Sequence, residues 1–377
     1  MGAIRQSLSK PGARLLVGAA GVGVIAAALI VGAILVPSGS SSPVIEQLAS
    51  DSPSPSPSPP PAPPPPKVAS PINGLMLDRA VYDSLQAKAP LAVMIENHPD
   101  ARPQAGLNQA DLVYEAIAEG GITRYMAVYW STEAGRIQYV RSARLYYVQW
   151  AAELSAIYTH WGQVEDPGSV DVWPVLARLG VRDLNGLILG EEVGYRDDSR
   201  FAPHNVFTDT GLLWRSAQAH SFSGPPILEP WKFKEDEPQR PANPAERAAP
   251  IVNVTFGSPG SDFDVTWYYD PAANGYVRSL GGAPHTDAIT GEQLTARNIA
   301  VQFAPLRPSG IKAYNIIDTV GTGPAVVFQD GVAKVGSWHK DSEGGRTRFF
   351  DSAGGEMTFD RGRTWIEVVP TDSAVNY

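Results

Sequence analysis

Cysteine is absent from the 377 residues of this chain. Its absence excludes disulfide bonds, cysteine-ligated zinc, iron–sulfur clusters and thiol nucleophiles, and with them the cysteine-dependent transpeptidases of bacterial cell walls. Charged residues are also scarce, at 18%, whereas 43% of the residues are hydrophobic. This composition is that of a chain with a packed core and excludes a disordered polyelectrolyte.

The short motifs of common cofactor and catalytic sites are absent too. The sequence has no Walker A motif, GxGxxG, HExxH, EF-hand loop or GxSxG, so we expect neither a nucleotide cofactor nor a metal ion. His160, Glu165 and Asp166 lie close together, but without the spacing of a metal-ligand set. A glycosidase carboxylate pair stays open, because two acidic residues need no fixed separation.

One long hydrophobic run lies near the N-terminus. Residues 15–36 are 22 uncharged residues, and a helix of that length spans about 33 Å, enough for a bilayer core. Three cations precede the run, and no charge follows it before Glu46. The pattern predicts a retained transmembrane anchor, with residues 1–14 as a cytoplasmic tail and the C-terminal part outside the cell. The alternative, a cleaved signal peptide, usually has a shorter apolar segment.

Residues 37–70 are rich in serine and proline, which predicts an extended stalk of roughly 100 Å. The chain has a formal charge of −9, to which the tail contributes +3 and the stalk −1, so the remainder carries −11. An acidic body argues against binding to nucleic acid or to anionic lipid, because both require clustered positive charge.

A second proline-rich stretch, 221–250, separates two different patterns and contains seven prolines. Residues 71–220 mix strand and helix signals, which predicts an α/β or α+β domain. Residues 251–377 consist almost entirely of short strand candidates between turn residues, which predicts a mainly-β sandwich or barrel. We interpret 221–250 as a linker that packs partly through Ile227, Leu228, Trp231 and Phe233.

Several elements of the mixed domain can be placed by their hydrophobic period. The expected strands are 91–96, 122–130 and 156–160, and the expected helices are 169–179, 209–219 and one that starts at Ser142 as its N-cap.

The expected start of this last helix is rich in arginine. Arg141 and Arg144 flank Ser142, and Arg124 lies upstream. Cations at a helix N-terminus are unfavourable by a few tenths of a kcal/mol each, so we expect an anion to offset them. The internal candidates are Asp111, Glu115 and Glu119. The alternative is a ligand phosphate, pyrophosphate or carboxylate, which matches the planar fork of arginine.

Polar residues at expected strand ends and in loops are candidate supporting groups for this site. They are Asn97, His160, His204 and Asn205. Each of them either hydrogen-bonds the backbone of a turn or lies near the arginines as an acid, a base or a donor.

Several segments together resemble a known family. They are ENHPDARPQAGLNQADLVYEAIAEGGITRYMAVY (96–129), VRSAR (140–144), His160, DLNGL (183–187), APHN (202–205), WYYD, YVRS, HTD and TWIEVVP. The series is similar to the YerB-like bacterial family of proteins of unknown function. The resemblance implies an extracytoplasmic protein with a mixed N-terminal part and a β-rich C-terminal part, and it implies no reaction. Many members look like lipoproteins anchored through a cysteine, which this chain lacks, so we expect the transmembrane helix to replace that anchor.

Three functions stay open at this stage. The first is a membrane-anchored protein that binds an anionic envelope component through Arg124, Arg141 and Arg144. The second is an envelope enzyme, a phosphoryl-linked polymer transferase or a glycan hydrolase, with Asp111 or His160 as base. The third is a scaffold for another envelope protein, without a small ligand.

Overall fold

The computed structural model describes residues 65–164, 168–236, 246–258 and 260–377. The predicted cytoplasmic tail, the predicted anchor and most of the predicted stalk lie outside the described residues. In the part that is described, no helix is long and apolar enough to cross a membrane.

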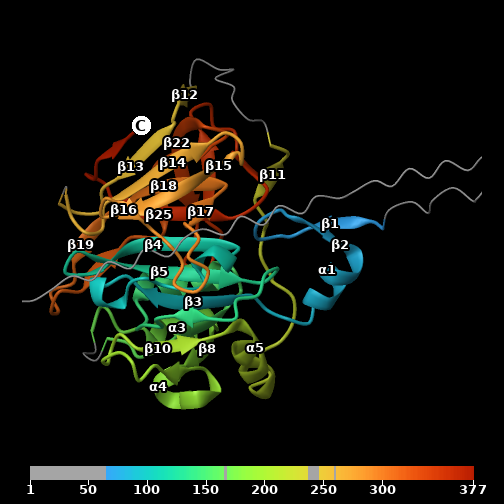
Figure 1. Ribbon diagram of the computed structural model, residues 1–377, viewed down its shortest axis with the longest axis vertical. Coiled ribbons are helices and arrows are strands. Elements are labelled where there is room, and N and C mark those ends of the chain that lie inside the picture. Colours follow the sequence, from blue (N-terminus) through green and yellow to red (C-terminus); the bar gives the residue numbers. More distant parts are fainter. Residues whose placement is uncertain (1–64, 165–167, 237–245, 259) are drawn as a thin grey trace, which may run out of the picture. The chain divides into compact units, whose positions relative to one another are not determined.

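An eleven-stranded sheet passes through both halves of the described chain (Figure 1). In spatial order its main path is β12 (Glu246–Ala248), β22 (Val332–Lys340), β21 (Gly321–Gln329), β18 (Asn298–Ala304), β25 (Thr364–Pro370), β4 (Leu112–Glu119), β5 (Ile122–Tyr129), β3 (Leu91–Glu96), β7 (Ile157–His160) and β8 (Arg182–Asn185), and β23 (Arg348–Asp351) pairs with β22.

The two halves of the sequence meet at the parallel pair β25 and β4. Trp365 lies opposite Val113, and Glu367 lies opposite Glu115. On its other side β25 pairs in parallel with β18. β-Branched and aromatic residues dominate these central strands, as expected for strands covered on both faces. The sheet therefore continues across the predicted domain boundary, and that boundary itself stays a prediction.

Side chains of the central strands alternate between two faces, and each face has its own core. On β3, Leu91 and Val93 belong to the first core, whereas Ala92 and Met94 belong to the second. The first core includes residues of the second sheet and of α5, and the second core includes residues of α2 and α3. The large sheet is thus the middle layer of the fold.

The second sheet has six strands. They are β16 (Ala283–Pro284), β15 (Gly275–Leu280), β14 (Val265–Asp270), β13 (Ile251–Val254) and β26 (Val375–Asn376), with β17 (Thr295–Ala296) paired to β15. The smaller pairings are β1 (Lys67–Ala69) with β2 (Met76–Asp78), β6 (Ile137–Gln138) with β10 (Val206–Thr208) and β9 (Tyr195–Arg196), β11 (Lys232–Lys234) with β24 (Thr358–Asp360), and β19 (Leu306–Pro308) with β20 (Asn315–Ile317).

The α-helices of the described residues are α1 (Arg79–Leu85), α2 (Leu145–Glu153), α3 (Trp173–Leu179), α4 (Gly186–Leu189) and α5 (Thr210–Ala219). All of them lie in the N-terminal half. The expected mixed character of this half and the expected mainly-β character of the other are therefore confirmed in outline. The predicted strands 91–96, 122–130 and 156–160 correspond to β3, β5 and β7. The prediction of Ser142 as an N-cap was wrong, because α2 begins at Leu145 and its N-cap is Arg144.

The described part of the predicted linker packs against the C-terminal strands. Trp231 is buried and stacks on Phe359 at a centroid distance of 4.6 Å, and β11 pairs in parallel with β24. Ile227 is exposed, contrary to expectation. Lys234 of β11 contacts Asp330 at 2.6 Å and Asp360 at 2.5 Å, which fixes this segment electrostatically.

A buried ion-pair network connects α2 to the C-terminal half on the second-core face. Glu153 of α2 contacts Lys340 Nζ at 2.5 Å and Arg346 Nη1 at 2.6 Å, and all three side chains are almost fully buried. Burial raises the pKa of Glu153, but the attraction of Lys340 and Arg346 outweighs it and lowers the pKa. Glu153 is therefore ionised, and its charge compensates two buried cations.

We expect Glu153→Ala to lower the free energy of unfolding by about 3–5 kcal/mol, because it leaves two buried cations without their anion. Urea unfolding at neutral pH measures the loss. Asp83→Ala, which removes an exposed ion pair with Arg79, is the control and should cost less than about 1 kcal/mol. Equal effects of the two substitutions would contradict the role of the buried network.

We expect the pair of Asp330 and Asp360 to make stability depend on pH. Burial raises the pKa of Asp360 to about 7 against the attraction of Lys234. Because this folded-state pKa is above the unfolded one, the contribution is present at low pH and is lost as pH rises through about 7. Unfolding at about pH 6 and about pH 8 should show this loss, and Asp360→Asn should reduce it. Asp318→Asn, at an exposed ion pair, should leave the pH difference unchanged.

Candidate functional site

The candidate site lies along the side of the large sheet that is formed by the carboxyl ends of the parallel strands β3, β7 and β8. Residues 141–144 lie along this edge, between β3 and β7. Arg141 N donates to Met94 O at 3.0 Å, and Ala143 N donates to Gly162 O at 2.9 Å. The carboxyl ends of parallel strands are a common location for ligand sites, because loops and side chains converge there.

Three arginines and two glutamates meet at this edge, and we call them the arginine edge: Arg124, Arg141, Arg144, Glu96 and Glu119. Arg124 Nη2 lies 2.7 Å from Glu119 Oε1, and Arg144 Nε donates to Glu119 Oε2 at 3.1 Å. Arg141 Nε lies 2.9 Å from Glu96 Oε1. The expected pairing of arginines with Glu119 is thus observed, whereas Glu96 was not among the expected partners.

Glu119 reaches the arginines because of the end of β4. The register of β4 and β5 shifts between Ile117 and Glu119, and such an irregularity redirects the side chain that follows it. Gly120 and Gly121, with φ of 57° and 81°, form the tight turn between the strands. Burial raises the pKa of Glu119, but Arg124 and Arg144 outweigh it and hold the pKa below its ordinary value.

The three arginines differ in exposure and in how fully they are bonded. The side chains of Arg124 and Arg144 are 2% and 6% exposed, whereas that of Arg141 is 23% exposed. Arg124 also donates through Nη1 to Ser142 O at 2.7 Å. Among the described residues, the Arg141 guanidinium contacts Glu96, and it does so through Nε. Both Nη groups of Arg141 are therefore left to bind an external acceptor.

Two histidines lie beside Glu96. His204 Nδ1 lies 2.9 Å from Glu96 Oε2, and the ring of His98 stacks on His204 at a centroid distance of 4.8 Å. An open cleft of about 540 Å³ adjoins His204, and Asp100, Ser199, Arg200 and Phe201 also line it.

The remaining supporting candidates have structural contacts. Ser142 Oγ donates to Trp161 O at 3.2 Å and does not cap the helix. Asn205 accepts from Arg196 Nη1 at 2.7 Å, which orders its own loop. His160 is fully buried, with Nδ1 2.6 Å from Gly162 O and Nε2 2.8 Å from Asp183 Oδ1.

The structure places Asp111, Glu115 and Asn97 away from the arginine edge. Asp111 precedes β4, an eight-residue strand that spans about 25 Å, and it accepts from Trp130 N and Ser131 N at 2.6 and 2.9 Å. Glu115 and Asn97 face the first core, where Asn97 Nδ2 lies 3.3 Å from Glu115 Oε1. None of the three residues could therefore support the arginines as predicted.

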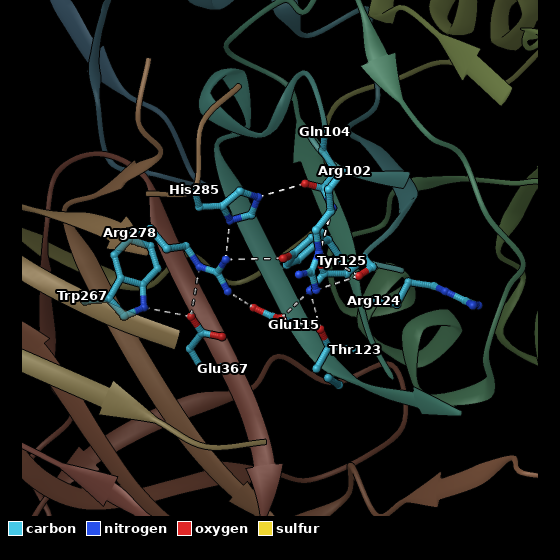
Figure 2. Close-up of polar contacts among 12 residues, drawn as sticks. Arg102, Gln104, Glu115, Thr123, Arg124, Tyr125, Trp267, Arg278, His285 and Glu367 are labelled. Atoms are coloured by element: carbon cyan, nitrogen blue, oxygen red, sulfur yellow. Dashed lines mark hydrogen bonds and ion pairs between the residues drawn. The ribbon is translucent and has the colours of Figure 1, made fainter. Parts of the chain in front are cut away.

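A second polar network fills the first-core face beneath the second sheet (Figure 2). Arg278 of β15 pairs with Glu115, and its Nε lies 4.0 Å from Glu367 Oε1. His285 lies between Arg278 Nη1 and Gln104 Oε1, at 2.5 and 2.9 Å. Figure 2 also shows Arg124 pointing away from Glu115, so the network and the arginine edge are separate.

Burial dominates the ionisation of this network. It raises the pKa of Glu367 well above the ordinary value, and the nearby Glu115 carboxylate raises it further. Burial and then the charge of Arg278 lower the pKa of His285 well below the ordinary value. Both shifts favour the uncharged forms of Glu367 and His285 beside the contact of Arg278 with Glu115.

Sequence reasoning missed Glu96, Arg278, His285 and Glu367 as functional or structural polar groups. The segments ENH, YVRS, HTD and TWIEVVP that carry the family resemblance contain these residues. Their position in these segments was the one indication that the sequence offered of their importance. It did not show which of these residues contact one another.

We expect Glu119→Gln to lower the free energy of unfolding by about 2 kcal/mol or more at neutral pH, because Arg124 and Arg144 lose a buried counter-charge. The folded pKa of Glu119 is lowered, so its contribution is present above the unfolded pKa and lost as pH falls through the folded one. The difference between wild type and variant, measured by urea unfolding, should therefore shrink in acid. Glu192→Gln, at an exposed pair with His220, should show neither effect.

Comparisons with known proteins agree with this architecture. The family model described as "Protein of unknown function (DUF3048) N-terminal domain" matches residues 78–223, and the model of the corresponding C-terminal domain matches residues 252–366. The chain is 31% identical over 305 residues to "Putative lipoprotein YerB" of Bacillus subtilis (strain 168), covering 81% of this chain and 87% of the relative. A crystal structure of the YerB protein from Bacillus subtilis superposes with a TM-score of 0.70 at 29% identity, covering 82% of this chain and 100% of that one. The chain belongs to the DUF3048 family of bacterial proteins, as its sequence motifs indicated.

Proposed function

We propose that this chain is an extracytoplasmic protein of the cell envelope that binds an anionic envelope component at the arginine edge. Its similarity to a protein named as a lipoprotein supports the location. The hydrophobic run 15–36, in place of a lipidated cysteine, supports a transmembrane anchor with the C-terminal part outside.

The bonding of Arg141 is the observation that carries this proposal. The three guanidinium groups of the arginine edge pair with two carboxylates, which leaves one positive charge in excess among these five side chains. Arg141 is the most exposed of the three arginines, and its Nη groups are left for a ligand. A planar fork of two N–H groups matches phosphate or carboxylate oxygens. The edge therefore suits the anionic part of an envelope polymer or lipid-linked precursor.

Arg124 and Arg144 have a different role in this proposal. Both are buried against Glu119, so they add positive potential without touching the ligand. In a partly desolvated site this potential is screened less than at an open surface. Arg141 therefore makes the direct contact, and the other two strengthen it.

The structure offers little support for the enzyme hypothesis through its expected bases. Asp111 is buried and bonded to backbone amides at the far end of β4. Both ring nitrogens of His160 face acceptors, the Gly162 carbonyl and the Asp183 carboxylate. The ring is fully buried and both nitrogens are engaged within the protein, so neither is open to a substrate. Binding is therefore the function that the described residues favour.

We expect Arg141→Ala to abolish anion binding while the fold is retained. The full-length chain in detergent is screened by thermal shift with inorganic phosphate, pyrophosphate, citrate, muropeptides and teichoic-acid fragments. A ligand at about 100 times its Kd stabilises by about 2.7 kcal/mol, and this shift should disappear in the variant.

Arg348→Ala is the matched control. Arg348 donates through Nε to Glu356 at 2.9 Å and its side chain is 25% exposed, much as in Arg141, but Arg348 lies on β23 and its Nη1 also pairs with Glu229 at 2.9 Å. This variant should bind like wild type. A ligand shift that persists in Arg141→Ala, or that disappears equally in Arg348→Ala, would contradict the proposed site. No shift with any ligand would favour the alternative of a protein partner.

A further inference from the structure

Three potential metal ligands converge beside the arginine edge. His98, Asp100 and His204 each place a donor atom within 4.8 Å of those of the other two. His98 and Asp100 come from the loop after β3, and His204 comes from a loop before β10. Their separation in the sequence explains why no spaced ligand motif indicated them.

The hydrogen bonds of the two rings indicate which nitrogen of each ring can bind a metal ion. His204 Nδ1 lies 2.9 Å from Glu96 Oε2, so Nδ1 donates to the carboxylate and Nε2 carries the lone pair. His98 Nδ1 accepts from Asp100 N at 3.2 Å and lies 3.5 Å from Asp100 Oδ2. Its lone pair is therefore on the side of that carboxylate, and a metal ion at Nδ1 replaces this one hydrogen bond from the backbone. A histidine that donates its second N–H to a carboxylate has the arrangement typical of a metal ligand.

We propose that His98, Asp100 and His204 bind a divalent transition-metal ion and that Glu96 orients His204. Two imidazoles and one carboxylate suit zinc and similar ions better than calcium or magnesium, which prefer oxygen ligands. The proposal goes beyond the anion-binding function and does not depend on it.

The geometry needs only a small closure. Ligand atoms around a tetrahedral zinc ion with bonds of about 2.0–2.1 Å lie about 3.4 Å apart. The side chain of Asp100 is 73% exposed and that of His98 is 33% exposed, so both can rotate inwards, whereas His204 is held by Glu96.

An ion bound there is accessible from outside. The adjoining cleft of about 540 Å³ is lined by Asp100 and His204 themselves. Three protein ligands and an open position are the pattern of zinc sites that take up water or a ligand oxygen, whereas structural zinc sites are closed by four protein ligands.

Metal titration of the full-length chain tests this proposal. The chain carries no histidine tag, is stripped with a chelator and is titrated with Zn²⁺ alone by calorimetry. We expect one equivalent of tight binding, a rise in melting temperature, and a loss of affinity on the order of 100-fold in His98→Ala and in His204→Ala. Co²⁺ should give a visible d–d spectrum that both substitutions change.

His220→Ala is the control, because His220 also pairs with a glutamate at 3.0 Å but lies elsewhere on the surface. It should bind Zn²⁺ like wild type. The melting temperature of each metal-free variant checks its fold, and His98→Ala keeps the test valid if His204→Ala unfolds. Absence of stoichiometric binding, or binding that both substitutions leave unchanged, would overturn the proposal.

Discussion

The buried contact between Arg278 and Glu115 joins the second sheet to the centre of the large sheet, where β25 and β4 bring the two halves of the chain together. Arg278 comes from the second sheet and Glu115 from β4, and both side chains are fully buried. Removing one partner of such a pair leaves a charge in a low-dielectric interior, which costs far more than the pair gains. The parallel pairing of β25 with β4 places Glu367 next to the same guanidinium. Burial and then Glu115 raise the pKa of Glu367, which favours its neutral form beside this guanidinium. The contact therefore places a buried ion pair between the two sheets, directly beside the junction of β25 and β4.

Strand alternation separates this network from the arginine edge, although the same strands build both. Glu96 and Asn97 are consecutive, yet Glu96 contacts Arg141 and Asn97 contacts Glu115 on the opposite face. Glu115 and Glu119 would share a face in a regular strand. The register shift before Glu119 turns its carboxylate towards Arg124. One face of these strands thus carries the fully buried pair of Arg278 and Glu115, and the other carries the partly exposed guanidinium of Arg141.

Local patterns in the sequence were sufficient for much of the N-terminal half. The run 91–96 predicted β3 because it is continuously apolar, and β3 is buried on both faces. The run 122–130 predicted β5 because it alternates and is rich in aromatic and β-branched residues, although β5 is also buried on both faces. The arginines and Glu119 were identified because unpaired charge near a helix start needs an anion. Glu96 was not identified, since the final residue of an apolar strand looks like an ordinary boundary residue. The contact of Arg278 with Glu115 depends on the pairing of strands from opposite ends of the chain, and no local period encodes that pairing. Ser142 failed as an N-cap because the tertiary contact of Arg141 with β3 keeps residues 141–144 extended.

Glu96 connects the two proposed sites. Its Oε1 accepts from Arg141 and its Oε2 accepts from His204, so one carboxylate orients both the guanidinium proposed to bind an anion and the ring proposed to bind a metal ion. A cation at the histidines draws the negative charge of Glu96 towards His204 and weakens its hold on Arg141. The released guanidinium then binds an external anion more strongly, and the cation itself adds attraction. By thermodynamic linkage the bound anion must increase the affinity for the metal by the same factor. The shared carboxylate and the charge of the cation transmit this coupling, so it needs no movement of the strands.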